Sequence, residues 1–113
     1  MPQKNLIVDL TFDFALAIIV FTEELETLKK FNIARQLFRS GTSIGANVRE
    51  AQGAESKADF IHKMKIAYKE LEESHYWLQL CLHSINYPKP EKLLTDIDPL
   101  FKIIGKIISS SKS

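Results

Sequence analysis

The feature that most constrains this chain is a stripe of small or apolar side chains between residues 60 and 85. Its members are spaced alternately by four and three residues, which places them along one side of a continuous α-helix. They are Phe60, Met64, Ala67, Leu71, Ser74, Leu78, Cys81 and Ile85. A helix with such a seam needs partner helices to cover it, so the pattern predicts a helical bundle.

Helical patterns also occur before and after this stripe. We expect helices over residues 9–28, 31–54, 57–85 and 91–109. The connections between them are short, and short connections favour antiparallel neighbours. No segment shows the sustained alternation of apolar and polar residues that indicates a strand. The sequence therefore predicts an all-α fold, with residues 1–113 forming a single domain, an antiparallel up-down-up-down four-helix bundle.

Apolar stripes predict which side of each other helix faces the core. In the first helix the stripe is Leu10, Phe14, Ala17, Phe21, Leu25 and Leu28. In the second it is Ile33, Leu37, Ile44, Val48 and Ala51, and in the fourth Leu93, Ile97, Leu100, Ile104 and Ile107. Residues 14–21 are apolar all round the first helix, although a bundle of this size covers one side of each helix. The spare side predicts self-association, unless long neighbouring side chains cover it within one subunit.

Three local features shape the predicted helices. Gly41 and Gly45 lie inside the second helix, where each glycine costs about 1 kcal/mol relative to alanine; we expect a close approach of another backbone there, or a mild kink near Gly41. Ser56 and Asp59 resemble a capping box at the start of the third helix. Pro99 either bends the fourth helix or lies in the first turn of a helix that restarts there.

Composition limits the function classes. The formal net charge is +1, which argues against a strongly basic nucleic-acid coat. The single cysteine, Cys81, excludes an internal disulfide and lies on the apolar stripe, so we expect a buried thiol and a reducing compartment. The longest apolar run, residues 14–21, is far shorter than the roughly 20 residues that cross a bilayer. We expect a cytoplasmic protein with no membrane partner.

Catalytic and metal signatures are weak. Glu72 and His75 form one Glu-x-x-His step, whereas helical bundles that hold two metal ions use such a step on two helices. Neither a phosphate-binding loop nor a dinucleotide-binding glycine pattern occurs. We therefore expect no enzyme, no metal, no cofactor and no small-molecule substrate.

A line of arginines is the candidate nucleic-acid surface. Arg35, Arg39 and Arg49 lie along one side of the second predicted helix, and Lys57 follows nearby. Arginine makes bidentate contacts with phosphates, so this set could bind RNA or DNA. The alternative is an ordinary solvated helix face whose charges form salt bridges.

Ser43, Asn47 and Glu50 form a polar line on the same helix. Buried polar groups usually bond one another or a facing helix. The hypothesis from the sequence is that these three residues fix the register within the bundle or between subunits.

Two segments resemble a known bacterial family. Residues 39–60, RSGTSIGANVREAQGAESKADF, and residues 66–78, IAYKELEESHYWL, are similar to the 23S rRNA intervening-sequence proteins. The resemblance implies an antiparallel four-helix bundle and ring-shaped pentamers. Related accessory proteins of diversity-generating retroelements bind nucleic acid and a reverse transcriptase.

The sequence thus predicts a non-enzymatic helical bundle that self-associates, with a pentamer implied by the resemblance. Its further partner could be RNA, DNA or an enzyme that acts on nucleic acid. The alternative is a purely structural protein–protein interaction module that binds no nucleic acid.

Overall fold

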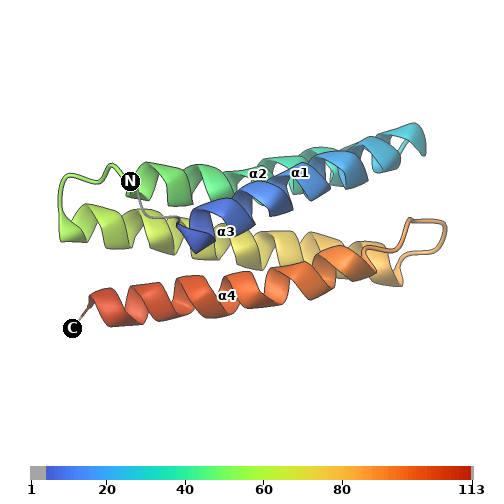
Figure 1. The fold of residues 1–113 in the computed structure, drawn as a ribbon. Helices are drawn as coiled ribbons and strands as arrows, with labels where there is room; N and C mark the ends of the chain where they lie inside the picture. The colour runs from blue at the N-terminus through green and yellow to red at the C-terminus, as the bar shows by residue number, and fades with distance from the viewer. Residues whose placement is uncertain (1–4, 113) are drawn as a thin grey trace.

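The computed structural model describes residues 5–112, which form four α-helices and no strand. They are α1 (Leu6–Thr27), α2 (Phe31–Ala51), α3 (Lys57–His83) and α4 (Glu91–Ser111) (Figure 1). The predicted all-α class is confirmed.

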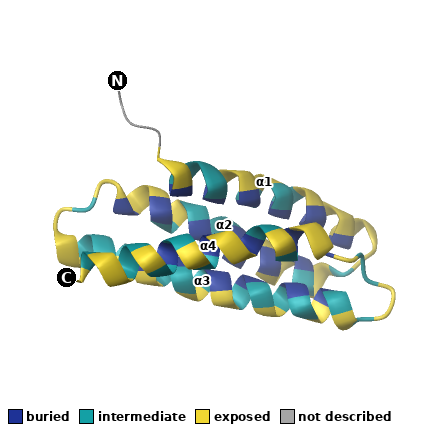
Figure 2. Ribbon diagram, turned by 60° about the horizontal axis from the view of Figure 1, so that its bottom comes forward, coloured by how far each residue is buried: buried dark blue, intermediate teal, exposed yellow. Residues whose placement is uncertain are grey.

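The helices lie side by side in an elongated body of 46 × 27 × 21 Å. Helix α1 contacts α2, α2 contacts α3, α3 contacts α4, and α4 contacts α1. Along the first pair, Gly41 approaches Ile18, whereas Gly45, one turn later, approaches the earlier residue Thr11. The four helices therefore enclose one core, and each has a side that no other helix of the subunit covers (Figure 2).

The seam of α3 is the best-predicted element of the core. Met64, Ala67, Leu71, Ser74, Leu78 and Cys81 are all fully buried. Phe60 is half-buried, and the prediction fails at Ile85, which is 84% exposed. The reason is that α3 ends at His83 and the chain turns to an extended conformation at Ser84, so the helical spacing no longer applies.

The core side of α1 differs from the predicted stripe. Its buried residues are Ile7, Thr11, Phe14, Ile18, Phe21, Thr22 and Leu25. Leu10 and Ala17 are only half-buried, and Leu28 is exposed. Two threonines take core positions because their hydroxyls donate to carbonyls of the same helix, each at 2.8 Å, so burial leaves no polar group unpaired.

In α2 the buried residues are Ala34, Leu37, Ser40, Gly41, Ile44, Val48 and Ala51, and in α4 they are Leu93, Ile97, Leu100 and Ile104. The predicted stripes are confirmed at most positions. Ile33 and Ile107 are half-buried and pack against the edge of the core.

The ends of the helices follow local capping chemistry. Helix α1 begins at Leu6, three residues before the predicted start, because the side chain of Asn5 accepts a hydrogen bond from the Val8 amide. Ser56 accepts from the Asp59 amide at 3.0 Å, as expected, but the Asp59 carboxylate accepts from the amide of Glu55. Helix α2 ends at Ala51, not residue 54, and α4 runs through Pro99 without restarting.

Candidate interaction surfaces

Helices α1 and α2 approach closely at two glycines. A Cβ atom on Gly41 would lie 2.8–2.9 Å from three side-chain carbons of Ile18, and a Cβ on Gly45 would lie 3.2 Å from the carbonyl oxygen of Thr11. Neither position has room for a side chain without a shift of its neighbour. The close approach expected from the sequence is confirmed, and α2 continues as a helix through the site of the alternative kink.

The outward side of the same helix pair is strongly apolar. Phe12, Leu16 and Val20, spaced by one turn along α1, are 50%, 48% and 68% exposed. On α2, Phe31 and Phe38 are 51% and 46% exposed. We call these five residues the α1/α2 outer face; Val20 lies at its edge, where it also lines a hollow with Pro90 and Leu93. Neighbouring side chains of the same chain leave the face about half exposed or more, so the alternative of internal covering is wrong at these positions.

Two hollows lie in the groove between α1 and α2 beside this face. One has a volume of about 240 Å³ and is lined by residues that include Phe12, Gly45 and Arg49. The other has a volume of about 350 Å³ and includes Phe31, Arg35 and Phe38 in its lining. The guanidinium of Arg49 lies 5.7 Å from the centre of the Phe12 ring, within the range of a cation–π contact. The groove thus combines apolar walls with a cation in each hollow.

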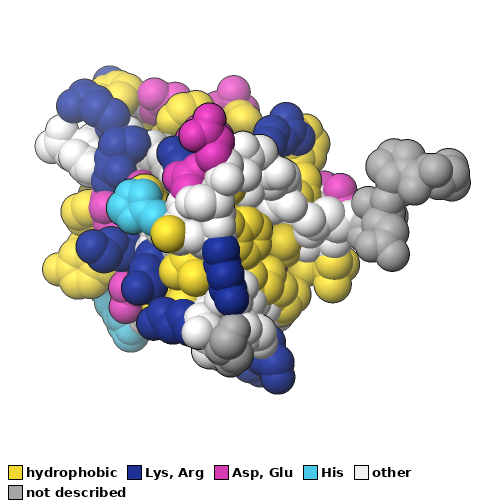
Figure 3. All heavy atoms as spheres, turned by 90° about the vertical axis from the view of Figure 1, so that its left-hand side faces the viewer, with side chains coloured by type: hydrophobic (Ala, Val, Ile, Leu, Met, Phe, Trp, Pro, Cys, Tyr) yellow, Lys and Arg dark blue, Asp and Glu magenta, His cyan; other side chains and the backbone are white. Residues whose placement is uncertain are grey.

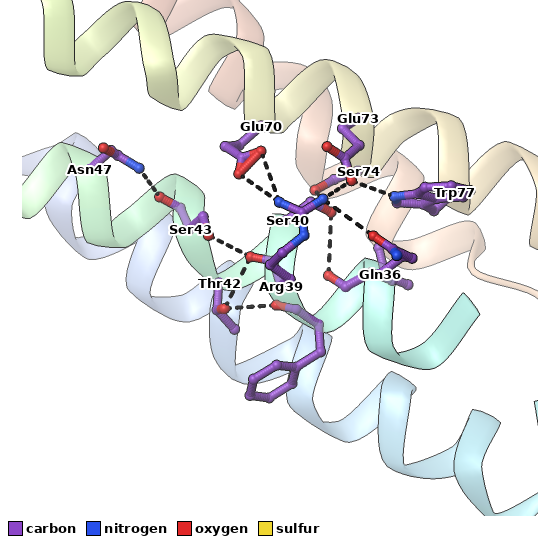
Figure 4. A network of polar contacts seen from close by, with 12 residues as sticks. Gln36, Arg39, Ser40, Thr42, Ser43, Asn47, Glu70, Glu73, Ser74 and Trp77 are labelled. Carbon is purple, nitrogen blue, oxygen red and sulfur yellow. Dashed lines mark hydrogen bonds and ion pairs between the residues drawn. The ribbon is translucent and has the colours of Figure 1, made fainter. Parts of the chain in front are cut away.

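The predicted arginine line is divided between two sides of α2. Arg35 and Arg49 lie in the groove with α1, whereas Arg39 is paired with α3. Its guanidinium is 3.3 Å from the carboxylate of Glu70 and also pairs with Glu73 (Figure 4). The salt-bridge alternative is therefore confirmed for Arg39.

The Arg39 cluster extends further along α3. The indole Nε1 of Trp77 donates to the Glu73 carboxylate at 2.9 Å. Two carboxylates thus neutralise the guanidinium, which leaves it poorly placed to bind a phosphate. Lys57 stands apart from this cluster, because it begins α3 beyond the α2–α3 connection.

The polar line of α2 makes mostly local contacts. The hydroxyl of Ser43 donates to the carbonyl oxygen of Arg39 at 2.6 Å, and the Asn47 amide donates to the carbonyl oxygen of Ser43 at 2.9 Å. Only Glu50 reaches another helix, through an ion pair of 3.0 Å with Lys63. Ser43 and Asn47 therefore do not link helices in the subunit.

A different pair supplies the buried polar link between helices. The hydroxyl of Ser74 donates to the hydroxyl oxygen of Ser40 at 2.8 Å, and both residues are fully buried. Ser40 in turn lies 3.4 Å from the carbonyl oxygen of Leu37. The sequence carried a signal for this contact, because Ser74 interrupts the apolar seam of α3 and Ser40 follows Leu37 by three residues.

The remaining candidate groups are the thiol of Cys81 and the histidine and acidic side chains. Burial raises the pKa of the Cys81 thiol to about 11, although nearby Lys89 opposes that effect, so the thiol is protonated at neutral pH. The His75 ring packs edge-on against Phe101. Within residues 5–112, no group of three or more His, Cys, Asp or Glu side chains is placed to hold a metal ion. In the same range no helix combines the length and apolarity that a membrane crossing requires.

Comparisons with known proteins agree on the family. The model of the 23S rRNA-intervening sequence protein family matches residues 3–110. A crystal structure of a protein of unknown function from the S23 ribosomal protein family of Bacteroides thetaiotaomicron superposes with a TM-score of 0.85 at 39% identity. That match covers 90% of this chain and 97% of the other. A search of curated proteins finds no match. The chain therefore belongs to the 23S rRNA-intervening sequence protein family.

Proposed function

We propose that this protein is a non-enzymatic scaffold module that self-associates through the α1/α2 outer face. The observation that carries the proposal is the exposure of Phe12, Leu16 and Val20 on α1 beside Phe31 and Phe38 on α2. Exposed apolar patches of this kind mark protein–protein contacts in soluble proteins. Aromatic side chains are also enriched at the centres of interfaces.

The proposed assembly is a closed ring, for which the family resemblance suggests a pentamer. A ring needs a head-to-tail contact, in which each copy presents two different surfaces. The groove between α1 and α4 is the candidate for the second surface, since it holds a hollow of about 410 Å³ with Phe14, Ala17 and Leu100 in its lining. An antiparallel up-down-up-down bundle places these two grooves on either side of α1. The contacts of Gly41 and Gly45 with α1 support that arrangement.

For the arginines of α2, a protein–protein contact is better supported than nucleic-acid binding. Arg39 is neutralised by α3, and Arg35 and Arg49 lie in the groove that self-association would cover. A cytoplasmic setting agrees with a chain whose single thiol is buried and free.

Light scattering on a dilution series tests the proposal. The wild-type chain should have a mass several times its 12.9 kDa. Leu16→Glu should give a monomer, because a buried unpaired carboxylate at the contact is costly. The matched control is Leu80→Glu on α3, where the leucine is 38% exposed and lies away from the α1/α2 outer face. This control should keep the wild-type mass.

Two outcomes would count against the α1/α2 outer face. If the wild type is a monomer at all concentrations, self-association is wrong. If Leu80→Glu dissociates the assembly and Leu16→Glu does not, the contact lies on another surface. Circular dichroism of both variants should show the helix content of the wild type.

A further inference from the structure

A second surface on the opposite side of the bundle has a different chemistry. The segments 60–69 and 99–112 contain no Asp or Glu, although they include six lysines. Helices α3 and α4 bring these segments together, because Tyr68 packs edge-on against Phe101 at 5.5 Å between ring centres. The start of α3 and the end of α4 therefore form one side of the molecule (Figure 1).

Five of these lysines lack an acidic partner among the described residues. Lys63 pairs with Glu50, but no ion pair involves the other lysines of these segments within residues 5–112. All five are exposed. They are Lys65, Lys69, Lys102, Lys106 and Lys112, which we call the lysine face. Figure 3 views this end of the bundle and shows basic side chains gathered over its left and lower parts.

The nearest carboxylates bound the lysine face without entering it. Glu72 lies one turn from Lys69 and Asp98 one turn from Lys102, and the Asp59 carboxylate accepts from the Glu55 amide at the start of α3. No ion pair joins these carboxylates to the five lysines within residues 5–112. Unlike Arg39, whose charge is matched by α3, these lysines keep their charge available for an external anion.

The groove between the two lysine rows is shallow and open. It holds a hollow of about 360 Å³ lined by residues that include Tyr68, Gly105 and Lys112. Gly105 contributes no side chain to close it, and the hydroxyl-bearing Ser109 lies on its edge. Lysines one turn apart on a helix have Cβ atoms about 6 Å apart. Lys65 and Lys69 on α3, and Lys102 and Lys106 on α4, each form such a pair, and Lys112 lines the hollow itself.

We infer that the lysine face binds the phosphate backbone of a nucleic-acid duplex without reading its sequence. Lysine supplies point charges for phosphates, whereas base recognition uses bidentate arginine or amide side chains, which the face lacks. Tyr68 packs against Phe101, so its ring is not free to stack unpaired bases. The face also lacks the exposed apolar side chains that insert into a membrane. This inference does not rest on the α1/α2 outer face, because the lysines lie on α3 and α4.

The test measures binding of a fluorescently labelled 20-base-pair DNA duplex by anisotropy across a salt series. The wild type should bind at 50 mM salt and weaken steeply as salt rises. Lys65→Gln/Lys106→Gln should lower the affinity about tenfold and reduce the salt slope by about 2, since each phosphate contact contributes about 0.9. The matched control, Lys29→Gln/Lys30→Gln, removes the same charge from the α1–α2 connection at the other end of the bundle (Figure 1) and should bind as the wild type does.

Parallel probes separate the alternatives. An RNA duplex should bind comparably, and a single strand of the same length should bind more weakly. Absence of duplex binding at 50 mM salt would overturn the inference. Equal losses in the two double variants would also overturn it, because only net charge would then matter. Stronger binding to phosphatidylserine vesicles than to the duplex would point to a membrane instead. Leu16→Glu should change the mass but retain duplex binding, so the two proposals fail separately.

Discussion

Helix α2 packs against its two neighbours, α1 and α3, through different kinds of contact. On the α1 side, the side chain of Ile18 packs directly on Gly41, and the backbone of Thr11 lies close to Gly45. On the α3 side, Ser40 bonds Ser74 and Arg39 pairs with Glu70 and Glu73.

The difference extends to what each seam shows to solvent. The seam between α2 and α3 is edged by charges that satisfy one another, whereas the α1/α2 outer face presents exposed aromatic and aliphatic side chains. The proposed self-association would cover that face. The contrast shows that two seams of one helix can share a core pattern and still differ in the chemistry they expose.

The largest effect should come from filling the glycine contact. Gly41→Ala should destabilise the fold by about 1 to 3 kcal/mol, because the new methyl would overlap buried carbons of Ile18. Gly105→Ala is the matched control. Its Cβ would be 3.6 Å from Tyr68, an ordinary contact, so it should stabilise α4 by about 0.5 to 1 kcal/mol.

Urea unfolding of the two variants measures both changes. The same glycine-to-alanine change should therefore lower the free energy of unfolding at position 41 and raise it at position 105. Ile18→Val should restore part of the stability lost in Gly41→Ala. Equal gains in both variants would mean that α1 and α2 are not in close contact at Gly41.

A comparable effect at high pH should come from Cys81 in the core. Its thiol titrates at an ordinary pKa of 9.0 when unfolded and at about 11 when folded, because burial disfavours the thiolate. The folded state keeps its proton longer, so its contribution to stability is complete below pH 9 and is lost as pH rises towards 11. The loss should reach at most about 3 kcal/mol.

Unfolding free energies measured at pH 8 and pH 11 test this sign. Cys81→Ala serves as the reference, since it cannot lose this proton. The wild type should lose more stability than the variant over that interval. The same loss in both proteins would show that other groups cause the pH dependence.

A moderate effect should come from the polar link on the α3 side. Ser40→Ala should cost about 1 to 2 kcal/mol, because the buried hydroxyl of Ser74 loses its acceptor. Ser40→Ala/Ser74→Ala should cost less than the sum of the single changes. A double-mutant cycle from urea unfolding measures the coupling, and strict additivity would contradict the contact.

The smallest effect should come from the surface ion pairs. Arg39→Ala should lower stability by less than about 1 kcal/mol, because Arg39 is half exposed and water screens the pair. The mass of the assembly should not change. Thermal unfolding and light scattering measure the two quantities. A loss of several kcal/mol would mean that the seam between α2 and α3 depends on charge more than its exposure suggests.

The sequence predicts the core of α3 well because its apolar spacing is unbroken over six buried residues, from Met64 to Cys81. It places the core side of α1 less accurately. Leu10 and Ala17 look like core residues, but Thr11 is the one buried, because its hydroxyl can bond a carbonyl of its own helix. Where a helix is apolar all round, apolar character alone does not show which positions are buried.

The interaction surfaces were only partly predictable. The spare apolar side of the first helix was visible in residues 14–21, yet the contributions of Phe31 and Phe38 depend on how closely α2 approaches α1. In the sequence the arginines form one continuous line, because helical spacing does not reveal which residues of other helices they pair with. Only the fold reveals that Arg39 is paired and that distant lysines of α3 and α4 share one face.

Hydroxyl-radical footprinting at low and high protein concentration compares the two sides of the molecule directly. The account predicts that Phe12, Leu16 and Phe38 become protected as concentration rises, while Tyr76 on α3, which is 58% exposed, keeps its reactivity. Reactivity at Phe12 and Phe38 that is independent of concentration, in a chain whose mass stays at 12.9 kDa, would contradict it.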